Sequence, residues 1–119
     1  MKNTLLLLSA QAALVAGQCP NLHIFGARET TVSPGFGSAG QLINMIINAN
    51  PGATSEAITY PACGGQASCG GIAYGDSARQ GTNAVASQVN NFHQRCPNAQ
   101  IVLVGYSQVS IVDEPFWSF

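Results

Sequence analysis

The spacing of hydrophobic and polar positions along the chain changes several times, and it predicts three strands and two helices. Three short apolar runs predict strands, at residues 22–25, 56–60 and 101–104. Between the first two runs, apolar residues at helical spacing predict a helix over roughly residues 38–48. A longer helix precedes the last run: Asp76 or Ser77 is expected to cap it, and it should end by Cys96.

The order strand, helix, strand, helix, strand predicts an α/β fold. Such an order implies parallel strands joined by right-handed crossovers. The last strand, from Ile101 to Val104, is apolar throughout. That pattern is typical of a strand that is covered on both faces of the sheet.

The N-terminus has the layout of a secretory signal peptide. A basic start at Lys2 precedes an apolar stretch over residues 5–15, and small residues then stand before a cleavage point ahead of Gln18. We therefore expect residues 1–17 to be removed and the protein to be secreted. The alternative is a buried first helix. No other stretch approaches the ~20 apolar residues that a membrane span needs.

The charge distribution narrows the choice of partners. The chain of 119 residues has room for one domain at most. It carries four Lys or Arg and five Asp or Glu, for a net charge of −1, and has no run of like charges. This pattern gives no support for a nucleic-acid partner or a polybasic membrane contact, and we expect a monomer.

The four cysteines of the mature chain predict two disulfides, for which three pairings are possible. Parallel strands start at the same edge of a sheet, so Cys19 and Cys96 can meet there, while Cys63 and Cys69 can close the loop between them. Topology favours this pairing. Zinc is the alternative, but the only close pair has C-x5-C spacing, so we expect no metal.

The last predicted strand leads into the candidate nucleophile. Gly105-Tyr106-Ser107-Gln108 supplies four of the five positions of the G-x-S-x-G nucleophile elbow, and the fifth is Val109. A serine at the carboxyl end of a parallel strand lies at the edge where α/β proteins bind ligands. The backbone N–H of Gln108 is the expected first oxyanion donor, and the loop at residues 29–31 could supply a second. The alternative is that Ser107 is a turn serine.

The base that would activate this serine is not found in the sequence. No histidine follows Ser107, and the only later acids are Asp113 and Glu114. His23 lies in the first predicted strand, where we expect it to be packed and hydrogen-bonded. His93 lies near the end of the long helix, where a histidine interacts favourably with the helix dipole. We therefore predict neither a general base nor an orienting acid within this chain.

Taken together, these segments resemble the N-terminal half of fungal acetylxylan esterases of the cutinase-like serine esterases. The matching segments are residues 19–31, 60–65, 68–71 and 101–108. Cutinases share the elbow, but the Arg-Glu-Thr-Thr segment at residues 28–31 and the C-x5-C loop point to the acetylxylan branch.

The resemblance implies a lidless, three-layer α/β-hydrolase fold with a parallel sheet. It also implies that Ser107 is the nucleophile, that Thr30 and Gln108 frame the oxyanion hole, and that the disulfides are Cys19–Cys96 and Cys63–Cys69. The reaction would remove acetyl groups from xylan through an acyl-serine intermediate, without a metal or a cofactor.

The resemblance ends at Val109, where the family continues with glycine and later supplies the catalytic Asp and His. We therefore expect residues 18–108 to form the N-terminal part of the domain, leaving the fold incomplete at the C-terminus. Residues 109–119 would be an unrelated tail, and a chain truncated in this way would be inactive. Two alternatives stay open: a cutinase-like polyester hydrolase and a non-enzymatic secreted fragment.

Overall fold

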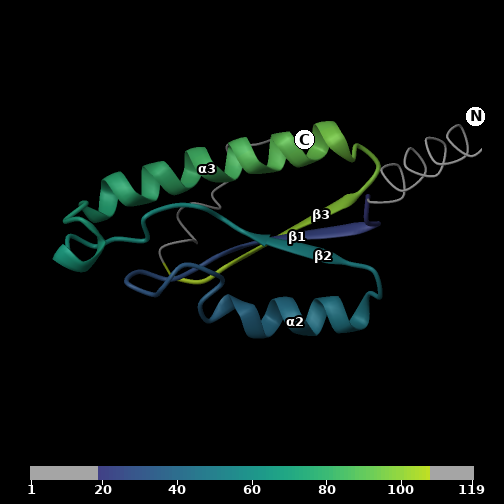
Figure 1. The fold of residues 1–119 in the computed structure, drawn as a ribbon, viewed down its shortest axis with the longest axis horizontal. Helices are drawn as coiled ribbons and strands as arrows, with labels where there is room; N and C mark the ends of the chain where they lie inside the picture. The colour runs from purple at the N-terminus through teal and green to yellow at the C-terminus, as the bar shows by residue number, and fades with distance from the viewer. Residues whose placement is uncertain (1–18, 108–119) are drawn as a thin grey trace, which may run out of the picture.

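The computed structural model describes residues 19–107, which form three layers around a small parallel sheet. The elements in chain order are β1 (Leu22–Ala27), α2 (Ala39–Ala49), β2 (Thr54–Ala57), the short 3-10 helix η1 (Ala67–Cys69), α3 (Tyr74–Arg95) and β3 (Gln100–Gly105). The strand order is β2-β1-β3, and both neighbours run parallel to β1. α3 covers one face of the sheet and α2 covers the other (Figure 1). The predicted α/β order with a parallel sheet is therefore confirmed.

The core lies on both faces of β1, the central strand. Successive residues of a strand point to opposite faces, so Phe25 packs toward Val85 and Val89 of α3. Ile24 packs with Ile43 of α2 in a second cluster. All five side chains are almost completely buried. Each helix is thus held to the sheet by one set of alternating β1 residues.

Gly26 allows α2 to approach β1 closely. A Cβ atom added to Gly26 would lie 2.3 Å from Cδ1 of Ile43 and 2.6 Å from Cδ1 of Phe36. Both distances are far below van der Waals contact, so a larger residue at position 26 would force the buried side chain of Ile43 and the ring of Phe36 to shift.

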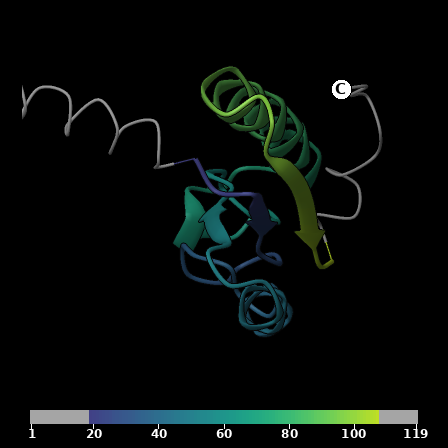
Figure 2. The same cartoon turned by 90° about the vertical axis from the view of Figure 1, so that its right-hand side faces the viewer.

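β3 is less buried than its sequence suggested. Its apolar residues contact both core clusters but are only half-buried. The reason is that, within the described part of the chain, β3 pairs with β1 along one edge and has no strand along the other. The end-on view shows β3 at one side of the sheet (Figure 2).

Two predicted boundaries are wrong. The second strand spans residues 54–57 rather than 56–60, and Ile58 and Tyr60 follow it as buried core residues. Their burial, rather than strand pairing, produced the apolar signal. α3 begins at Tyr74, and its N-cap residue is Ala73, which has no side chain that can cap the helix. Ser77 lies inside the first turn, where its hydroxyl accepts the N–H of Cys63.

Two disulfides are present, and they lie at different places in the fold. Cys19–Cys96 joins the segments that precede β1 and β3, with a Cα–Cα distance of 5.6 Å. Cys63–Cys69 closes the loop after β2, with a Cα–Cα distance of 5.7 Å. Among residues 19–107, no helix is both long enough and apolar enough to cross a membrane.

Candidate active site

The carboxyl ends of β1 and β3 lie side by side and bring two predicted site residues to the same edge of the sheet. In the register of these strands Ala27 pairs with Gly105. Thr30 follows the end of β1 by three residues, and Ser107 follows the end of β3 by two. Ser107 is exposed at this edge. The crevice beyond the carboxyl ends of parallel strands is where open α/β sheets bind their ligands.

Backbone strain is concentrated at this edge. Within residues 19–107 the non-glycine residues with positive φ are Thr31 at 67°, Ala62 at 49° and Ser107 at 66°. Each of them follows a different strand of the sheet. Left-handed backbone at a non-glycine residue costs on the order of 1–3 kcal/mol and persists where the surrounding structure holds it, often at functional sites. The positive φ of Ser107, directly after a strand, is what a sharp strand-to-helix elbow requires.

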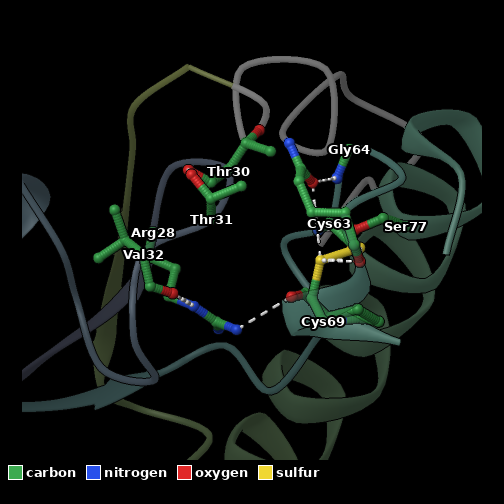
Figure 3. Close-up of a disulfide and its surroundings, with 10 residues drawn as sticks. Arg28, Thr30, Thr31, Val32, Cys63, Gly64, Cys69 and Ser77 are labelled. Carbon is green, nitrogen blue, oxygen red and sulfur yellow. Dashed lines mark hydrogen bonds between the residues drawn. A yellow bond between two sulfur atoms is a disulfide. The ribbon is translucent and has the colours of Figure 1, made fainter. Parts of the chain in front are cut away.

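The loop that carries Thr30 is held by the loop after β2. The N–H of Thr31 donates to the carbonyl oxygen of Ala62 over 2.8 Å, so two of the strained residues are joined. The methyl group of Thr30 packs against Gly64, where an added Cβ would lie only 3.2 Å from that methyl carbon. Figure 3 shows Thr30 and Thr31 facing the Cys63–Gly64 segment across this edge.

The loop after β2 is in turn hydrogen-bonded to α3. The N–H of Cys63 donates to the Oγ of Ser77, which is fully buried in the first turns of α3, over 2.9 Å. The Cys63–Cys69 disulfide closes the same loop. The position of Thr30 is therefore set through Ala62, Gly64 and Cys63 rather than by β1 alone.

Arg28, directly after β1, forms hydrogen bonds to both the loop after β1 and the loop after β2. Its side chain is only 6% exposed. Nε donates to the carbonyl oxygen of Val32 over 2.7 Å, and Nη2 donates to that of Pro61 over 3.2 Å. The hydroxyl of Tyr60 donates to the carbonyl oxygen of Arg28 over 2.6 Å. From the sequence, Arg28 had no role beyond the family segment at residues 28–31, and Ser77 was named only as a candidate helix cap.

Glu29, which precedes Thr30 in the loop after β1, is hydrogen-bonded to the start of α2. Its Oε1 accepts the N–H of Ser38, at the start of α2, over 2.9 Å. Hydrogen bonds from Ser38 lower the pKa of Glu29 below the ordinary value of 4.5. A carboxylate beside the first turn of a helix is also stabilised by the helix dipole. Glu29 therefore supports the start of α2.

Both histidines lie toward the opposite, amino edge of the sheet. His23 is buried, as expected: Nδ1 lies 2.6 Å from Oγ1 of Thr54, Nε2 lies 2.9 Å from Oε1 of Glu56, and the ring stacks on Phe92. His93 is exposed in the last turn of α3, just before β3 begins. The structure thus brings neither imidazole to Ser107.

The remaining predicted positions fall outside the described residues. These are Gln108, Val109, Asp113 and Glu114. Across residues 19–107, no group of three or more His, Cys, Asp or Glu side chains is placed to hold a metal ion.

Comparison with known proteins identifies the family. The model of the family described as Cutinase matches residues 18–114, more than three quarters of the chain. The chain belongs to the cutinase family. A solved structure titled as the catalytic core domain of acetyl xylan esterase from Trichoderma reesei superposes with a TM-score of 0.77 at 64% identity, covering 80% of this chain and 47% of that one. The structure is accordingly part of a cutinase-like α/β-hydrolase fold.

Two curated members of the cutinase family show the same relationship in sequence. Cutinase 11 of Verticillium dahliae is 66% identical over 91% of this chain and 39% of its own length. Acetylxylan esterase 2 of Talaromyces purpureogenus is 61% identical over 76% of this chain and 38% of its own length. The chain therefore spans about two fifths of the length of these relatives.

Proposed function

We propose that Ser107 is the nucleophile of a serine carboxylester hydrolase and that Thr30 and Gln108 frame its oxyanion hole. One observation carries this proposal: Ser107 has a φ of 66° directly after β3, beside the β1 loop that carries Thr30. A serine on such a turn presents its Oγ to solvent at the end of the sheet. The backbone N–H of the next residue is the usual first oxyanion donor.

The reaction follows from this geometry. Oγ of Ser107 attacks the ester carbonyl, the alcohol leaves, and water then hydrolyses the acyl-serine. The attack requires a base that takes the hydroxyl proton. His23 and His93 both lie toward the amino edge, so neither can be that base. We therefore expect no turnover by the 119-residue chain alone, and we assign activity to a form that also supplies a base and an orienting acid.

Acetylated xylan is the proposed substrate class. Relatives at 58% and 61% identity are named as acetylxylan esterases, and the segment at residues 28–31 favours that branch. We also propose that residues 1–17 are a signal peptide and that residues 18–108 are the N-terminal part of a cutinase-like α/β-hydrolase domain. Residues 109–119 would then be an unrelated tail. The two disulfides fit a secreted protein.

A polyester such as cutin is the second candidate substrate. The observation that favours it is the 66% identity to a protein named Cutinase 11. The exposed Tyr106 beside Ser107 offers a small apolar surface there. A secreted fragment without enzymatic activity is the remaining alternative for the 119-residue form.

Labelling with a fluorophosphonate, followed by peptide mapping, tests the nucleophile. In a form of the protein that also supplies the base and the orienting acid, the label should appear on the peptide that contains Ser107 and should vanish in Ser107→Ala. Ser87→Ala, an exposed serine of α3, is the matched control and should leave labelling intact. Labelling of another serine would contradict the assignment. Acetate release from acetylated xylan, measured against a long-chain ester, then separates the two substrate classes.

A further inference from the structure

A hollow lies beside the proposed oxyanion loop, between the segment after β1 and the disulfide loop after β2. Its volume is about 440 Å³. Its lining includes Arg28, Thr31, Ala62, Ser68 and Cys69. Figure 3 shows the guanidinium of Arg28 between Val32 and Cys69. No acidic side chain lines it.

The guanidinium of Arg28 is buried over the ring of Tyr60, with Cζ 5.4 Å from the ring centroid, and has no carboxylate partner among residues 19–107. Among residues 19–107 the ion pairs are His23–Glu56 and Arg79–Asp76, so no carboxylate lies within 4.0 Å of Arg28. A guanidinium has five N–H donors, and the structure gives hydrogen bonds from Nε and Nη2 to two carbonyl oxygens. No fully buried side-chain nitrogen in the described region lacks a partner. Nη1 makes no hydrogen bond to residues 19–107, so it keeps some exposure, and Arg28 is one of the residues that line the hollow.

This arrangement favours an anion of a particular shape. A charge removed from water is costly unless a group of opposite charge pairs with it. The planar fork of a guanidinium matches the two oxygens of a carboxylate, and such bonds are stronger than those between neutral groups. We propose that this hollow is a carboxylate-binding site in which Arg28 is the ligand-binding residue.

The site lies next to the proposed chemistry. Thr31 lines the hollow and is adjacent to Thr30 in sequence. A carboxylate bound there could be the acid released by ester hydrolysis, or a uronic acid substituent on the polysaccharide. Binding itself is independent of the proposed function; only the assignment of the carboxylate to the reaction rests on it.

An NMR titration of the 119-residue chain tests the site directly. The ligands are acetate and D-glucuronate, with D-glucose and chloride as matched neutral and ionic controls at constant ionic strength. We expect the Arg28 Nε–H resonance and the Thr31 and Ala62 amides to shift with either carboxylate, with dissociation constants on the order of 1 mM. Acetate alone would identify the product acid, and tighter glucuronate binding would identify the polymer substituent.

Two variants at one exposed residue of the hollow separate an effect on carboxylate binding from an effect on folding. Ser68 is exposed and lines the hollow. Ser68→Glu supplies a competing carboxylate and should weaken acetate binding about tenfold or more. Ser68→Gln has nearly the same size without the charge and should stay within about twofold of the parent. The proposal would be overturned if glucose or chloride caused equal shifts, or if the Arg28 resonance did not shift. It would also be overturned if the two variants bound acetate with equal affinity.

Discussion

Removing the two disulfides one at a time should destabilise the protein by different amounts. Cys19–Cys96 links residues separated by 77 positions, whereas Cys63–Cys69 links residues separated by 6. In the chain-entropy model the cost grows with the logarithm of loop length, which gives about 4.5 kcal/mol for the long loop and about 2.4 kcal/mol for the short one. Each pair contains one deeply buried cysteine, Cys96 at 7% exposure and Cys63 at 0%. Loss of side-chain packing is therefore similar in both pairs, and loop length dominates the difference.

The comparison uses the double variants C19A/C96A and C63A/C69A. Urea unfolding followed by far-UV circular dichroism, with the parent protein under non-reducing conditions, gives the free energy of unfolding of each. We expect C19A/C96A to lose roughly 2 kcal/mol more than C63A/C69A. If C19A/C96A is already unfolded without urea, C63A/C69A must still fold. An equal loss, or a greater loss in C63A/C69A, would refute the argument from loop length.

Two further predictions concern the β1–α2 layer. Gly26→Ala should lower the free energy of unfolding by about 1–3 kcal/mol, because its Cβ would lie 2.3 Å from Cδ1 of Ile43. Gly75→Ala is the control: this position on α3 faces open space, so the change should be neutral or stabilising by up to about 1 kcal/mol. Thermal unfolding of both variants checks the contrast, and similar effects would contradict it. Because hydrogen bonds from Ser38 lower the pKa of Glu29, the ionised carboxylate stabilises the folded state above pH 4.5. This stabilisation is lost as the pH falls below 4.5, since the unfolded chain then binds the proton before the folded chain does. Urea unfolding against pH should therefore show parent and Glu29→Gln converging in acid; a gap that widens there would contradict the assignment.

The order of elements could be read from the sequence because local periodicity carries it. The apolar run of β1 and the apolar stripe of α3 are formed by residues close together in sequence, and the sequence predicts both elements. The second strand was misplaced because Ile58 and Tyr60 are buried without being part of it. The half-burial of β3 depends on which strands lie beside it, which its own composition does not determine.

The site was predictable only in part, for a related reason. Ser107 stands out because a strand and a short motif precede it. The contacts that fix the opposite loop are non-local: Arg28 bonds a carbonyl 33 residues away, and Cys63 bonds Ser77 across 14 residues. The strain at Thr31 and Ala62 likewise depends on their mutual hydrogen bond. No spacing along the chain marks such contacts in advance.

Acetate release from acetylated xylan, by a form of the protein that also supplies the base and the orienting acid and by the Ser107→Ala variant of that form, tests the central claim most directly. The account predicts hydrolysis by the parent protein and a loss of at least about a thousandfold in kcat in the variant, because no other group can form the acyl intermediate. Circular dichroism should show that the variant keeps the parent fold. Undiminished hydrolysis by a folded Ser107→Ala protein would contradict the claim that Ser107 is the nucleophile.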